Sequence, residues 1–148
     1  MSSYILSFGS LKVYNKTKHL IIANFIMALI SLAIGGIAAI FIASGRFGIS
    51  SLINILGISD MNYYQWLTLH GMNMLIFWIV WAEIAILYFT SSVLLSWPIY
   101  GYRIAWFALS IMLYGQILVE YSIFSGNAAY YSQLILLLLQ ILFFTLAT

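Results

Sequence analysis

The residue with the clearest chemical potential in this sequence is His70, which lies a few residues inside a long apolar run. An imidazole ring can bind a metal ion through either nitrogen, and it can exchange a proton near neutral pH. Gly71 leaves space beside this ring for a flat ligand. Met74 and Phe77 follow four and seven residues after His70, so in a regular helix they line the same face.

Two interpretations of this arrangement are open. A wall of polarizable and aromatic side chains beside a histidine suits a haem, and it suits an ordinary helix interface nearly as well. In the second case His70 is a structural residue, with a neutral ring hydrogen-bonded to a helix carbonyl or hydroxyl group.

The composition places this histidine in a membrane. Of the 148 residues, 65% are apolar and only 5% are charged, and the mean hydropathy is +1.09. Globular proteins carry about a quarter charged residues. A histidine in a membrane helix is costly unless it faces other helices and has a partner, so its presence favours a function. The few basic residues form no patch, and we expect no nucleic-acid partner.

The other residue types limit the chemistry that the chain can perform. It has no cysteine, two histidines and three acidic residues, so disulfides and thiolate metal sites are excluded. A complete multi-ligand metal centre is excluded as well. The sequence contains no phosphate-binding loop, serine-nucleophile constellation or zinc motif. It therefore predicts a component that binds its cofactor together with other helices, not a self-contained enzyme.

Two acidic residues fall within predicted helices. Glu83 follows His70 on the same helix, ~20 Å deeper and on a different face. We interpret Glu83 as a carboxylate that reaches water at the inner end of its helix, with the entrance of a proton path as the alternative. Glu120 lies near the outer end of the next helix, where Gln116, one turn earlier, can share its hydrogen bonds.

The remaining polar residues have weaker claims to a function. His19 is interpreted as an interfacial residue. Arg46, in a predicted outer loop, either meets lipid headgroups or neutralises a haem propionate. Asn73 and Gln140 are predicted to make hydrogen bonds between helices.

These residues require an all-α membrane fold with four transmembrane helices that belong to a larger bundle. The predicted spans are 20–43, 64–89, 104–124 and 130–148; residues 1–18 form a cytoplasmic segment, and 19–148 the membrane region. A signal peptide is the alternative for the first span, but that run is longer than a signal core and lacks a convincing cleavage site. On this span, small residues at every fourth position predict close helix contact: Ser31, Gly35, Ala39 and Ala43.

The basic residues predict the orientation of the chain. Four spans place both termini on the same side of the membrane. The positive-inside rule makes this side cytoplasmic, because it then carries four of the five basic residues, Lys12, Lys16, Lys18 and Arg103. The sequence thus predicts a multi-pass protein of the cell membrane with both termini in the cytoplasm. His70 then lies ~9 Å below the outer face.

The residues around His70 resemble a known family. The run Tyr-Tyr-Gln-x-Leu-Thr-Leu-His-Gly, ending at Gly71, is similar to the second transmembrane helix of subunit I of heme-copper terminal oxidases, in particular the B-type branch of some thermophilic bacteria and archaea. The order of elements is also similar. The resemblance implies that His70 is an axial ligand of a low-spin haem, of a type left open, near the outer side of the membrane.

The resemblance also implies partners. In the family, electrons from cytochrome c or quinol pass through this haem to a haem-copper centre, where oxygen is reduced and protons are pumped. The other ligands of that machinery lie on later helices, so copper is expected only on partner helices. The chain is similar to the first third or so of subunit I. We expect it to be part of a larger assembly, as a piece of a split subunit, a truncated product or an accessory subunit, together with other oxidase subunits and lipid.

Two alternatives remain at this stage. The first is a haem-free structural subunit of a respiratory complex that packs through the small residues of its first span. The second is a small transporter or channel, which is disfavoured because no predicted helix carries a polar stripe along its length.

Overall fold

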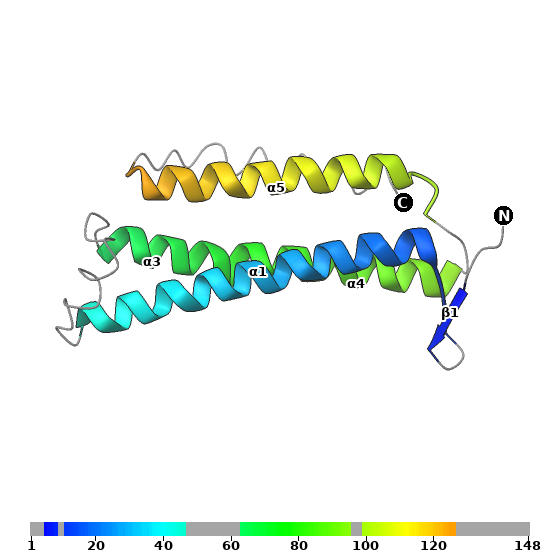
Figure 1. Cartoon of the computed structure of the whole chain (residues 1–148), viewed down its shortest axis with the longest axis horizontal. Coiled ribbons are helices and arrows are strands. Elements are labelled where there is room, and N and C mark those ends of the chain that lie inside the picture. The colour runs from blue at the N-terminus through cyan, green and yellow to red at the C-terminus, as the bar shows by residue number, and fades with distance from the viewer. Residues whose placement is uncertain (1–4, 9–10, 47–62, 96–98, 127–148) are drawn as a thin grey trace.

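The protein is mainly helical in a computed structural model. The structure describes residues 5–8, 11–46, 63–95 and 99–126. The elements in chain order are strands β1 (Ile5–Phe8) and β2 (Leu11–Tyr14), helix α1 (Asn15–Arg46), helix α3 (Tyr63–Gly71), the wider helical segment η1 (Met72–Phe77), helix α4 (Trp78–Leu95) and helix α5 (Tyr102–Phe124). The segments α3, η1 and α4 follow one another without a break. The described chain is therefore helical apart from one short hairpin (Figure 1).

Among the described residues, three helices are long and apolar enough to cross a membrane: α1 with 32 residues, the continuous helix Tyr63–Leu95 with 33, and α5 with 23. Each exceeds the roughly 20 residues that a bilayer requires. Their outer faces carry large exposed apolar side chains, such as Leu94 at 79% and Leu75 at 72% exposure. Lipid is the environment that such faces require. The fourth predicted span, 130–148, lies outside the described residues, as does Gln140.

The predicted helix boundaries differ from the observed ones at most ends. Helix α1 begins at Asn15 and not at residue 20, so Lys16, Lys18 and His19 lie in its first turns. Strands β1 and β2 pair antiparallel directly before it. The expectation of an all-α chain missed this hairpin, although its β-branched and aromatic residues favour strand conformation. Tyr63–Leu95 also extends past the predicted end at residue 89.

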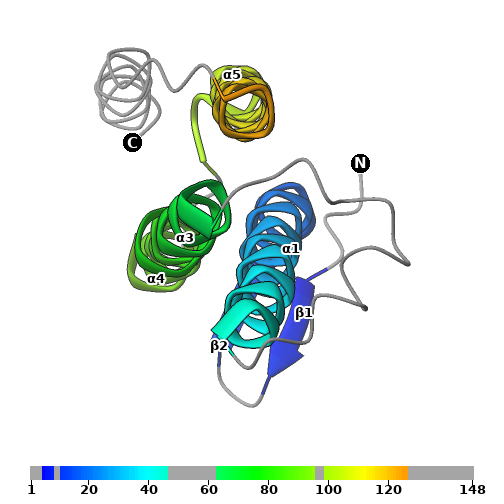
Figure 2. The same ribbon diagram turned by 90° about the vertical axis from the view of Figure 1, so that its left-hand side faces the viewer.

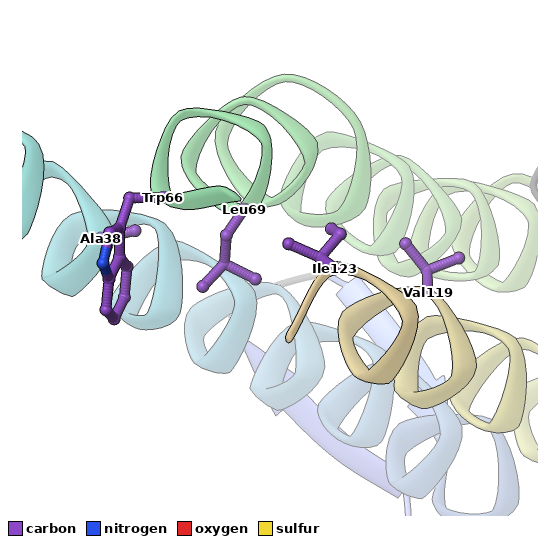
Figure 3. Packing of buried hydrophobic residues seen from close by; sticks show 5 residues of the cluster. All are labelled: Ala38, Trp66, Leu69, Val119 and Ile123. Carbon is purple, nitrogen blue, oxygen red and sulfur yellow. The ribbon is translucent and has the colours of Figure 1, made fainter. Parts of the chain in front are cut away.

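The end-on view shows the three long helices at the corners of a triangle (Figure 2). Apolar contacts join them at two levels. At one level Ala38 of α1, Trp66 and Leu69 of α3, and Val119 and Ile123 of α5 form a buried cluster (Figure 3). At the other end of the molecule a smaller cluster contains Leu20, Tyr88 and Ala105.

The face of α1 that contacts the other helices was predicted only in part. Ser31 and Gly35 are buried as expected, but Ala39 is partly exposed and Ala43 is exposed. An α-helix has 3.6 residues per turn, so a strict four-residue repeat rotates steadily away from its starting face. The buried stripe instead alternates steps of four and three residues: Asn24, Ala28, Ser31, Gly35 and Ala38.

This corrected stripe makes a testable prediction. Replacing Ala38, which has no exposed surface, with phenylalanine should destabilise the helix packing by about 1–3 kcal/mol, because the larger ring overfills a packed contact. The same change at the exposed Ala43 should leave stability unchanged. Unfolding of both full-length variants in mixed micelles, followed by circular dichroism, measures the difference. Equal stability of the two variants would contradict the observed helix face.

Candidate functional site

His70 lies on the last turn of α3 and reaches across to α1. Its Nδ1 is 2.9 Å from the main-chain carbonyl oxygen of Gly35, and the ring is partly buried. A carbonyl oxygen can only accept a hydrogen bond, so Nδ1 is the nitrogen that donates. In the neutral ring the hydrogen is therefore on Nδ1, and Nε2 keeps a free lone pair. Within the described residues, Nε2 has no hydrogen-bond partner.

This hydrogen bond agrees with both interpretations of His70 that the sequence left open. A structural histidine would bond to a helix carbonyl in this way. A metal-binding histidine would also do so, because such residues generally donate their second ring N–H to a carbonyl or carboxylate group. The geometry would thus allow Nε2 to bind a metal, and it does not require one.

The residues expected around a ligand are only partly gathered at His70. A Cβ atom added to Gly71 would meet no described atom within 4 Å, so this position leaves open space at the level of the ring. The Cγ and Sδ atoms of Met74 pack against Gly35 of α1, the residue whose carbonyl group bonds to His70. Phe77 packs on the buried cluster that contains Leu69, Val119 and Ile123.

The segment η1 changes the angle around the helix between His70 and Phe77 from the one that a regular α-helix gives. It is a π-helix of six residues, Met72–Phe77, that begins directly after Gly71. Hydrogen bonds in such a segment run to the fifth preceding residue, as from the Trp78 amide to the Asn73 carbonyl. One extra residue in a turn shifts the following side chains by roughly 100°. The sequence, apolar throughout this segment, gave no signal of the wider turn.

Arg46 lies at the end of α1, ~16 Å along the helix axis from Gly35. Its guanidinium Nη2 donates a hydrogen bond of 2.9 Å to the hydroxyl of Tyr63, at the start of α3. The two residues thus join the adjacent ends of the helices. Both side chains are exposed, so Arg46 could meet either a lipid headgroup or an acidic group of a ligand at this end.

A second polar group, centred on Gln116, connects all three helices. Its Oε1 accepts a 2.7 Å hydrogen bond from the indole Nε1 of Trp81 on α4. Its Nε2 donates at 2.9 Å to the Ser31 hydroxyl oxygen on α1 and at 2.9 Å to the Glu120 carboxyl oxygen. A longer contact of 3.5 Å joins Nε2 to Asn73 Oδ1.

This group confirms two predictions, and it contains more residues than the sequence indicated. Gln116 and Glu120 share a hydrogen bond, and Asn73 contacts a neighbouring helix, as expected. The sequence did not indicate that Ser31 and Trp81 join the same network. Ser31, Asn73, Trp81 and Gln116 are each at most 3% exposed. Since buried polar groups are costly without partners, we conclude that this network fixes the positions of the three helices.

The other candidate residues lie apart from these two groups. Glu83 is exposed on α4, and His19 is exposed near the start of α1. Among the described residues, no three histidine or acidic side chains come together to bind a metal. The part of the chain that the structure describes therefore holds no closed set of metal ligands.

No protein-family model matches this chain, and neither does any curated protein or solved structure.

Proposed function

We propose that this chain is a membrane component of a respiratory electron-transfer complex, in which Nε2 of His70 gives one axial bond to a low-spin haem iron. The observation that carries the proposal is the hydrogen bond from His70 Nδ1 to the Gly35 carbonyl. In the neutral ring it leaves Nε2 without a hydrogen, and this is the form in which imidazole binds a metal. A haem bound there would take up and release single electrons.

The surroundings of His70 support this proposal to a limited extent. The open space at Gly71 can accept the edge of a flat ligand. Met74 fixes the contact between the two helices beside the ring. Arg46 could bind a propionate only by sharing or releasing its hydrogen bond to Tyr63. Phe77 packs against the buried cluster that contains Leu69 and Val119, and its place beside a ligand stays a prediction.

The resemblance around His70 supports the more specific form of the proposal. On that basis, the chain corresponds to the first helices of an oxidase subunit I in the cell membrane, with both termini cytoplasmic. The second haem ligand and the copper site would come from the remaining helices of that subunit or from a complementary chain. Cytochrome c or quinol would supply the electrons.

A haem-free structural subunit is the second candidate. The Gln116 network favours it, because hydrogen bonds among three helices stabilise a scaffold whether or not a cofactor is present. The hydrogen bond of His70 to α1 would serve the same purpose.

A reduced-minus-oxidised optical spectrum of the native complex separates the two candidates. Replacing His70 with alanine should remove the low-spin haem signal while the chain still assembles. The matched control replaces His19, the other histidine, and should leave the spectrum unchanged. An unaltered spectrum in the His70 variant, with the chain at full occupancy, would assign His70 a structural role and favour the haem-free subunit.

A further inference from the structure

We infer that Gly35 is a positioning residue for His70. Its carbonyl group holds the imidazole in the Nδ1–H tautomer, and the absence of a side chain lets α3 approach closely enough for that hydrogen bond. The first part of this inference does not depend on a cofactor. Its second part rests on the proposed function: through His70, Gly35 lowers the reduction potential of the bound haem iron.

Close approach at Gly35 is evident from what surrounds it. A Cβ atom on Gly35 would lie 2.6 Å from Met74 Cγ, 2.8 Å from Met74 Sδ and 3.3 Å from Asn73 Cβ. The two contacts with Met74 are shorter than van der Waals contact, so any larger residue here requires the Met74 side chain, or the helix that carries it, to move. Met74 thus occupies the space that a side chain would take, one turn below the ring of His70.

The adjacent glycine provides a contrast on the same helix. A Cβ atom on Gly36 would meet no described atom within 4 Å. The two consecutive glycines have the same intrinsic effect on helix stability. They differ in their contacts, because only Gly35 touches the helix that carries His70.

The hydrogen bond has a predictable electronic effect. The Gly35 carbonyl attracts the Nδ1 hydrogen and makes the ring a stronger electron donor at Nε2. A stronger donor stabilises the oxidised iron more than the reduced iron, and such hydrogen bonds are among the ways in which a protein tunes a haem. Lengthening the bond should therefore shift the reduction potential to a more positive value.

The tautomer can be measured without haem. In the full chain carrying His19→Gln, His70 is the only histidine, so its two ring nitrogens can be assigned by ¹⁵N NMR. We expect Nδ1–H alone. Gly35→Ala should displace Met74 and α3 and produce a mixture of both tautomers, whereas Gly36→Ala should not. Adding Met74→Ala to Gly35→Ala removes the obstructing atoms and should restore the single tautomer. An Nε2–H tautomer in the parent, or an unchanged ring in Gly35→Ala, would overturn the positioning role.

The tuning role is tested by redox titration of the native complex. Gly35→Ala should shift the haem potential to a more positive value, Gly36→Ala should leave it unchanged, and the double variant with Met74→Ala should return it towards the parent value. A single Nδ1–H tautomer in a chain that binds no haem would refute the proposed function and the tuning, and leave the positioning role intact. Bound haem whose potential does not respond to Gly35→Ala would refute the tuning alone.

Discussion

Replacing Trp66 with alanine is expected to destabilise the helix packing by about 3 kcal/mol, among the largest effects of any single substitution in the described chain. Buried Trp-to-Ala changes in water-soluble cores cost about 3–5 kcal/mol. We expect the lower end of this range because lipid tails can replace some of the lost contacts. Trp66 is 6% exposed and belongs to the cluster that joins α1, α3 and α5.

The aromatic contacts of Trp66 explain the size of this effect. Its ring stacks on Phe41 of α1, with centroids 4.3 Å apart. It also meets the ring of Phe124 on α5 edge-on, at 6.5 Å. Aromatic pairs of this kind add about 0.5–1.5 kcal/mol beyond the area that they bury. One side chain therefore links three helices.

Unfolding of the full chain in mixed micelles, followed by circular dichroism, measures the effect. Tyr64→Ala is the matched control, since Tyr64 is the adjacent aromatic residue on the same helix and is 74% exposed. Its loss should change stability by less than 0.5 kcal/mol, as roughly expected for surface positions. Similar values for the two variants would mean that the Trp66 contacts contribute little to the fold.

Replacing Gln116 with leucine is the second substitution with a large expected effect, at about 1–3 kcal/mol. Leucine fills a similar volume but offers neither a donor nor an acceptor. The Trp81 indole N–H, which has no exposed surface around it, then loses its acceptor. An unpaired buried group costs about 1–3 kcal/mol, while hydrogen bonds between membrane helices average about 0.6 kcal/mol.

A double-mutant cycle isolates this interaction. Trp81→Phe removes the N–H donor and keeps most of the ring, so Gln116→Leu should cost less in that background than alone. The two effects then combine non-additively. Strict additivity in the same unfolding assay would show that the Trp81–Gln116 hydrogen bond does not contribute to stability.

The spans could be predicted because length and hydropathy alone determine which segments can cross a membrane. Three of the four predicted spans overlap described helices. The exact ends could not be predicted, since contacts near a membrane surface set them, such as the hydrogen bond of Arg46 to Tyr63. Ala43 was predicted to lie on the contact face of α1 and is exposed, because a four-residue repeat does not match the 3.6 residues of a helical turn.

The candidate site was predictable only to the level of His70 itself. Its hydrogen-bond partner is a main-chain carbonyl group. Every residue has such a group, so the side chains gave no sign of which residue would accept the bond. Gly35 was singled out for helix contact but not for this hydrogen bond. The apolar sequence of η1 gave no sign of the π-helical turn between His70 and Phe77. Gln116 and Glu120 were paired correctly since both lie on one helix, where a separation of four residues fixes their distance.

The Gln116 network also constrains the biosynthesis of this protein. Its acceptors and donors come from α1, through Ser31, and from the helix Tyr63–Leu95, through Trp81. Helix α5 enters the bilayer last of the three as the chain emerges from the ribosome. An amide group in lipid has no water with which to bond. We therefore expect Ser31 and Trp81 of the earlier two helices to be in place when Gln116 enters the bilayer, so that its amide group finds partners as α5 inserts.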